Sequence, residues 1–351
     1  MKNIALSLLC TFLSLGLWSQ EEYIFNSQES IDQFLIDNPD LTVLDGSLHI
    51  EHTEKTPITN LDGFINLTEV VSSITIRDNS FLENLSGLDN VYITPFNSGT
   101  SMEIMIFNNN SLSDISALTN KFTSLLNVHL NLGINPEIID LNDLHNLETV
   151  GKLTLFGMNG LENLEGLSNL TAIAGLGEEQ SLQFMFNENL ESLEGLTSLE
   201  NVTGPMEILN NDVLTSLDGL ENVVFSIDIP EVFLIAENDL LTDISALSLE
   251  NVGSMGFGIV NNKNLECCST DFLCDDLSIP SDLIFGNAIG CRAKAEVLEN
   301  CGLECGLINA FEEEEYADIA KIHPNPAVNQ LRITASQPVE VQILDCTGNS
   351  I

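Results

Sequence analysis

The chain of 351 residues is 44% apolar and strongly acidic, with 10 Lys and Arg against 53 Asp and Glu and a formal charge of -43. The apolar content is sufficient for a large core, whereas the charge excludes nucleic acid as a partner, because binding a polyanion requires a basic surface. We expect the acidity to keep the protein soluble and monomeric and to attract Ca²⁺ only weakly, at no fixed site, so no cofactor is expected.

Residues 1–20 predict a secretory signal peptide. Lys2 precedes an apolar run from Ile4 to Trp18, and small and polar residues follow before Glu21. The run is too short for a typical membrane span, and no stop-transfer charges follow it. We therefore expect an exported chain with no membrane span after removal of the signal.

Residues 21–43 predict an N-terminal capping helix, centred on residues 26–39. Asn26 or Ser27 can cap its start, and the Asn38-Pro39 pair ends it. Its apolar stripe consists of Ile31, Phe34 and Leu35. Such a helix would cover the open end of the repeats that follow.

Residues 44–266 repeat the motif N-x-x-L-x-x-L-x-[GA]-L. The first clear copy consists of Asn79, Leu82, Leu85, Gly87 and Leu88. Later copies begin at Asn109, Asn135, Met158, Asn187, Asn211, Asn238 and Asn262, at spacings of 30, 26, 23, 29, 24, 27 and 24 residues. A period of about two dozen residues predicts a mainly β solenoid.

A short strand is expected before each repeat Asn, as at Ile74 and Ile76 before Asn79, because apolar residues alternate there with period two. A single repeat cannot bury its own apolar face, so the repeats must stack around one continuous core. The Asn suits a turn in which its amide bonds the backbone, and the Gly or Ala leaves room for a corner. Asp143 at that corner and Met158 at the Asn position predict a locally irregular repeat.

Outward positions of these strands carry large apolar residues, as a protein-binding face does. The candidate ligand face consists of Met105, Phe107, Phe156, Met185, Leu209, Leu234 and Val260. Two alternatives remain open. A loop such as 92–101 or 174–180 could cover the face, or a register shift of one residue would place these side chains in the core.

Residues 267–305 predict a disulfide-rich C-terminal cap. The candidate cysteines are Cys267, Cys268, Cys274, Cys291, Cys301 and Cys305. Six cysteines allow 15 pairings, and removing the three that join the adjacent Cys267 and Cys268 leaves 12. A zinc site is the alternative, and the segment contains no His to favour it.

Residues 306–320 predict an acidic linker, and residues 321–351 predict the start of a small β-sandwich. A turn at Pro324, Asn325 and Pro326 precedes alternating apolar residues at 331–333 and 339–344, and Gly348 follows. The remaining length holds too few strands to close a sandwich.

Two families are similar to parts of this chain. Residues 41–266, through the repeat motif, resemble the receptor L-domain-like branch of leucine-rich-repeat proteins, which implies a right-handed parallel β-solenoid and recognition at a cell surface. Residues 322–351, through P-N-P, L-x-I and I-L-D-x-x-G, resemble an incomplete C-terminal sorting domain of type IX secretion substrates in Bacteroidota. That resemblance implies the type IX export machinery as a partner and a secreted or outer-membrane surface location in a Gram-negative bacterium.

Catalytic motifs such as G-x-S-x-G, H-E-x-x-H and Gly-rich phosphate loops are absent from the sequence. His49 and His52 fall on opposite faces of a strand, so we expect no metal site there. The sequence therefore predicts a recognition or adhesion protein that binds an extracellular protein or polysaccharide through its solenoid face. The alternatives are a polysaccharide-active β-helix enzyme and a purely structural surface protein.

Overall fold

The computed structural model describes residues 21–54, 56–95, 101–118, 124–174, 181–225, 232–247, 256–268, 270, 273–274, 283–301, 320–323 and 332–335. The predicted signal peptide, Cys305, the turn at 324–326, Gly348 and the linker up to residue 319 therefore lie outside the described residues. No helix among the residues described is long and apolar enough to cross a membrane.

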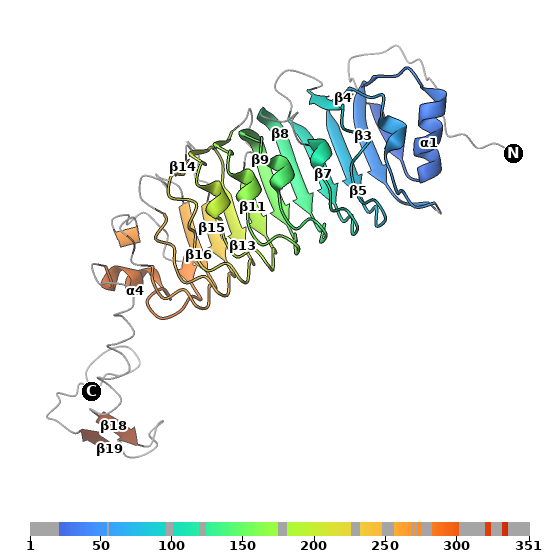
Figure 1. Cartoon of the computed structure of the whole chain (residues 1–351). Coiled ribbons are helices and arrows are strands. Elements are labelled where there is room, and N and C mark those ends of the chain that lie inside the picture. Colours follow the sequence, from blue (N-terminus) through green and yellow to red (C-terminus); the bar gives the residue numbers. More distant parts are fainter. Residues whose placement is uncertain are drawn as a thin grey trace, which may run out of the picture.

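The protein is mainly β, and its central feature is one large parallel sheet (Figure 1). Its main strands are β1 (Glu21–Phe25), β3 (Gly46–Glu51), β5 (Ser73–Arg77), β7 (Met102–Phe107), β8 (Ser124–Gly133), β9 (Thr149–Phe156), β11 (Leu182–Met185), β13 (Met206–Leu209), β15 (Val232–Ala236), β16 (Gly256–Val260) and β17 (Ile284–Phe285). Each strand pairs in parallel with the next strand of this series. The sheet therefore adds one strand for each sequence repeat.

Shorter elements complete each repeat. The strands β10 (Ala172–Ile173), β12 (Asn201–Val202) and β14 (Val224–Phe225) pair in parallel next to β9, and β2 (Val43–Leu44), β4 (Glu69–Val71) and β6 (Tyr92–Thr94) form a separate three-stranded sheet. Single 3₁₀ turns lie at the repeat corners, at η1 (Asp62–Phe64), η2 (Ser116–Leu118), η3 (Asn142–Leu144), η4 (Glu165–Leu167) and η5 (Glu194–Leu196).

The core follows the predicted alternation. The inward pairs Leu48/Ile50, Ile74/Ile76, Ile104/Ile106, Leu130/Leu132, Leu153/Leu155, Leu182/Phe184, Met206/Ile208, Phe233/Ile235 and Phe257/Ile259 are all buried. The motif leucines are buried with them in one continuous cluster. Apolar burial of this extent is the main stabilising contribution to such a stack.

The repeat asparagines form a buried hydrogen-bonded row, which we call the asparagine row. It consists of Asn79, Asn109, Asn135, Asn187, Asn211, Asn238, Asn262 and Asn287. At Asn109, Nδ2 donates to the Ile76 carbonyl at 3.0 Å, and Oδ1 accepts from the backbone N–H and Nδ2 of Asn79, both at 3.1 Å. The same bonds recur along the row, so each amide holds a strand end of the preceding repeat.

The irregularity predicted near the middle is real at Met158 but not at Asp143. Met158 replaces an Asn in the row, so Asn135 Nδ2, which also donates to the Ile106 carbonyl at 2.9 Å, meets the Met158 sulfur at 3.9 Å where other members of the row meet an amide oxygen. Asp143 lies in η3, an ordinary 3₁₀ corner. A second irregularity, a register shift between Leu125 and His129, occurs in the pairing of β8 with β9.

The helix α1 (Gln28–Asp37) lies at the N-terminal end of the sheet, within the predicted range (Figure 1). Ser27 caps it, Ile31 is fully buried, and Phe25, Phe34 and Phe64 pack ring against ring at centroid distances of 4.8 to 5.6 Å. The sequence did not predict β1, which precedes this helix and makes the sheet one strand longer than expected.

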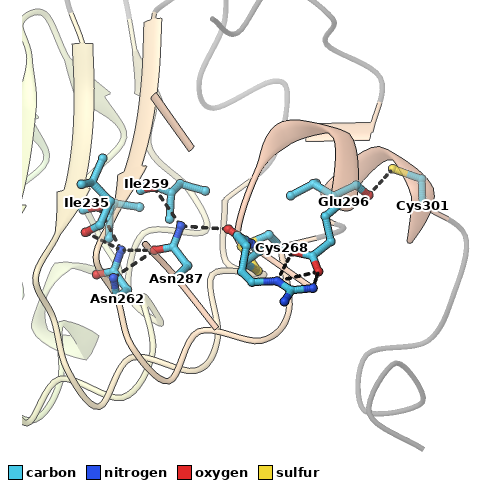
Figure 2. Close-up of a disulfide and its surroundings, with 11 residues drawn as sticks. Ile235, Ile259, Asn262, Cys268, Asn287, Glu296 and Cys301 are labelled. Carbon is cyan, nitrogen blue, oxygen red and sulfur yellow. Dashed lines mark hydrogen bonds and ion pairs between the residues drawn. A yellow bond between two sulfur atoms is a disulfide. The ribbon is translucent and has the colours of Figure 1, made fainter. Parts of the chain in front are cut away.

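Disulfide bonds at the C-terminal end join Cys268 to Cys291 and Cys274 to Cys301, and Cys267 is also disulfide-bonded. A further repeat, unpredicted, runs into this segment: β17 pairs with β16, and Asn287 continues the asparagine row by donating to the Ile259 carbonyl (Figure 2). The helix α4 (Lys294–Glu299) follows.

Beyond this segment, β18 (Ala320–His323) and β19 (Arg332–Ala335) form a separate antiparallel pair. β19 overlaps the strand predicted at 331–333, whereas β18 precedes the Pro-Asn-Pro turn and was not predicted as a strand.

Candidate functional site

The outward side chains at the ends of the main strands form one continuous line, here called the outer row. It consists of Glu51, Arg77, Phe107, Gly133, Phe156, Met185, Leu209, Ala236, Val260 and Phe285. The first two residues form an ion pair at 2.8 Å, whose hydrogen bond raises the Arg77 pKa. From Phe107 onward the row is apolar.

All seven predicted face residues lie on the outward side of the sheet, and all are half-buried. The alternative of a shifted register is excluded, because the intervening residues Ile104 and Ile106 are the buried ones. Residues 96–100 and 175–180 of the loops that could cover the face lie outside the described residues.

Aromatic rings gather in the middle of the outer row. Phe107 reaches over Gly133, where an added Cβ would lie 2.6 Å from two Phe107 ring carbons. The Phe107 and Phe156 rings are 6.1 Å apart, and the Phe156 and Phe186 rings are 5.3 Å apart. Because Gly133 has no side chain, the rings of Phe107 and Phe156 approach each other although their strands are not adjacent.

The residue that follows each outer-row residue adopts a left-handed backbone conformation. This left-handed row consists of Asp78, Asn108, Ile134, Gly157, Phe186, Asn210, Glu237, Asn261 and Gly286, with φ between 50° and 74°. From Asp78 to Asn261, each backbone N–H donates to the outer-row carbonyl of the next strand, as Ile134 does to Phe156 at 2.8 Å. Gly, Asn and Asp tolerate this conformation well, and most of the row uses them.

Ile134 and Phe186 depart from that preference. A branched or bulky side chain at positive φ typically costs about 1–3 kcal/mol, and here φ is 50° and 58°. Both side chains are exposed, by 36% and 47%, so burial does not explain them. With Phe107 and Phe156 they form one apolar area, the aromatic patch.

A second outward line, two residues earlier on the strands, is mixed in character. Met105 and Leu234 lie in it as predicted, but the residues between them are polar, namely Asn131, Thr154, Gln183 and Glu207. Thr154 donates to Gln183 at 3.0 Å, and Gln183 donates to Glu207 at 2.5 Å. This line forms a polar border to the aromatic patch.

An acidic groove continues from the aromatic patch along the same end of the strands. It is lined by Asn210, Asp212, Glu237, Asp239, Asn261, Lys263 and Gly286. Lys263 Nζ donates to Asp239 at 2.7 Å. That hydrogen bond, followed by the charges of Asp239, Asp212 and Glu237, raises the Lys263 pKa. With three carboxylates and one lysine in its lining, the groove has a net negative charge.

Sequence reasoning missed three residues of this site, namely Ile134, Phe186 and Phe285. The first two immediately precede a repeat Asn, and the third precedes the Gly286-Asn287 pair. Aligning the residue before each Asn would have revealed Ile134 and Phe186 at a position otherwise occupied by Asn, Asp, Gly or Glu.

Within the described ranges, no three His, Cys, Asp or Glu side chains are placed to hold a metal ion. Comparisons with protein-family models, with curated proteins and with solved structures give no match.

Proposed function

We propose that this protein is an exported recognition or adhesion protein, secreted or held at the surface of a Gram-negative cell, that binds a protein or polysaccharide along its outer row. Its repeats would form a right-handed solenoid of the leucine-rich-repeat, receptor L-domain-like type. In that architecture α1 closes one end and the cysteine-rich segment closes the other. The disulfides are compatible with an extracellular location.

One observation carries the proposal: half-buried apolar side chains lie in register along one face of the described sheet, at Phe107, Phe156, Met185, Leu209 and Val260. A partly exposed apolar line of this kind, with a polar border, is typical of an interaction surface. The type IX export machinery would be a second partner, acting through residues 321–351.

A binding screen tests the proposed function. The purified protein is tested against extracellular proteins and polysaccharides, alongside Leu209→Thr and Val260→Thr, which remove outward apolar atoms and keep strand-forming side chains. We expect the screen to find ligands that bind the wild-type protein and bind neither variant. Products of polysaccharide cleavage would instead indicate an enzyme, and ordered self-association would indicate a structural role.

A further inference from the structure

The aromatic patch and the acidic groove are neighbours in one row of the structure. Phe186 N–H donates to the Leu209 carbonyl, and Asn210 N–H donates to the Ala236 carbonyl, so Phe186, Asn210 and Glu237 lie on three successive strands. Adjacent strands are about 4.8 Å apart, so the edge of the patch is about 10 Å from the carboxylate at Glu237.

The shape of the patch favours an apolar side chain over a sugar ring. The Phe107 and Phe156 rings are tilted by 32°, and the Phe156 and Phe186 rings by 56°. They therefore pack against one another and do not present one flat stacking surface. The nearby Thr154 and Gln183 groups bond within their own line.

The charge around the patch favours a cationic partner. The groove holds three carboxylates and one lysine, which is already paired with Asp239. Arg77, at the other end of the outer row, is paired with Glu51. With a formal charge of -43 on the whole chain, a basic segment would be attracted and an acidic one repelled.

We propose, building on the recognition role above, that the partner is an extended protein segment with an apolar side chain followed four residues later by Lys or Arg. In an extended chain, residues four apart point to the same face, and at about 3.3 Å per residue they are about 13 Å apart, which reaches from the patch into the groove. The apolar side chain lies on the aromatic patch, and the cation enters the acidic groove.

The test uses fluorescent Gly/Ser peptides of about nine residues that carry Phe and, four residues later, Lys. In an extended chain these two side chains point to the same face, about 13 Å apart. Control peptides replace Phe by Ser, replace Lys by Glu, or place Phe and Lys next to each other. Fluorescence anisotropy measures binding to the full protein at salt concentrations from about 0.05 M to about 0.5 M. A neutral oligosaccharide is tested as a competitor.

Three variants complete the test. Phe186→Asn and Glu237→Asn each introduce the residue that Asn210 and Asn261 use in the same row. Glu165→Gln, on the exposed corner η4, removes the same charge away from the site. Because Asn suits the left-handed conformation, Phe186→Asn should unfold at an equal or higher temperature than the wild type, so a loss of binding would not reflect misfolding.

We expect the spaced Phe/Lys peptide to bind the wild-type protein more tightly than the control peptides do. Phe186→Asn should bind this peptide about tenfold more weakly than the wild type, which corresponds to about 1.4 kcal/mol. Glu237→Asn should also bind it more weakly, and its binding should depend less on salt. Glu165→Gln should bind as the wild type does. Equal binding of the Lys and Glu peptides, wild-type affinity in Phe186→Asn, or no peptide binding at all would overturn the inference. If an oligosaccharide binds instead and Phe186→Asn abolishes that binding, this inference is wrong and the recognition role stands. If no ligand depends on the outer row or the aromatic patch, both this inference and the recognition role are wrong.

Discussion

The asparagine row and the left-handed row are one residue apart in every repeat, yet they differ in every other respect. The first is buried and keeps one residue type at every repeat from Asn79 to Asn287 except Met158. The second is on the surface and contains Asp, Asn, Ile, Gly, Phe and Glu under one backbone conformation. The repeat therefore requires a single residue type at the inward position, whereas the adjacent position accepts several.

Removing one amide from the asparagine row should have the largest effect. Asn211→Ala would leave the Phe184 carbonyl and the Asn187 side-chain and backbone N–H groups without their present partner. Since unsatisfied buried groups cost about 1–3 kcal/mol each, we expect a loss of about 3 kcal/mol or more in the free energy of unfolding, measured by urea denaturation.

The matched control is Asn222→Ala. Asn222 is exposed, and its amide donates one hydrogen bond, to the Thr197 carbonyl. We expect a change below about 1 kcal/mol. Equal losses in the two variants would show that the asparagine row is no more important than any surface amide.

A corner glycine should come next. A Cβ on Gly195 would lie 1.9 Å from the Leu164 carbonyl oxygen, whereas one on Gly157 would meet nothing closer than Ile134 Cγ1 at 3.4 Å. Gly195→Ala must push two repeats apart, so we expect it to lower stability by about 2 kcal/mol. Gly157→Ala, at a φ of +59°, should lower stability by about 1 kcal/mol, because of its backbone conformation alone. Chemical denaturation measures both variants, and a larger loss in Gly157→Ala than in Gly195→Ala would contradict this interpretation of the corners.

The aromatic patch should respond in the opposite direction. Ile134→Asn and Phe186→Asn replace strained side chains with the residue that Asn108, Asn210 and Asn261 use, so each should raise stability by about 1 kcal/mol while weakening binding. Thermal unfolding measured together with the binding assay checks both parts. A variant that loses stability would mean that Ile134 or Phe186 serves the fold.

The inward half of the structure could be predicted from the sequence because the same pattern occurs many times. Pairs such as Ile104/Ile106 and Phe233/Ile235 alternate in every repeat, and all are buried as expected. A strand period of two leaves only one register that buries them. The asparagine turn was predictable for the same reason, although the bonds between successive amides were not.

The site was only partly predictable, because it depends on exceptions to the repeat. Ile134 and Phe186 are poor residues for positive φ, so residue preference argues against placing them there, and only their position before a repeat Asn indicates it. The repeat at Phe285 was missed because Gly290, and not a leucine, lies three residues after Asn287. The strand β1 was missed because no repeat turn follows it, although Phe25 pairs with Ile50.

The smallest effect is expected at Asp143, a corner where most repeats have Gly or Ala. Burial, together with the charges of Asp114 and Asp140, raises the Asp143 pKa, and the hydrogen bond from the Ile115 N–H at 3.2 Å offsets only part of this. Because the pKa in the folded state is above its unfolded value, the ionised carboxylate lowers stability at neutral pH. That loss should disappear as the pH falls through the folded pKa towards the unfolded value of about 3.9.

Asp143→Asn keeps the shape and an oxygen that can accept from Ile115, and it removes the charge. The variant should therefore be slightly more stable than the wild type near neutral pH, by about 0.5 kcal/mol, and the two should converge at about pH 4. Urea denaturation of both proteins across this range measures the difference, in which the titration of the other carboxylates cancels. A stability gain that does not change with pH would show that the corner responds to side-chain packing, and that the charge of Asp143 has no part in it.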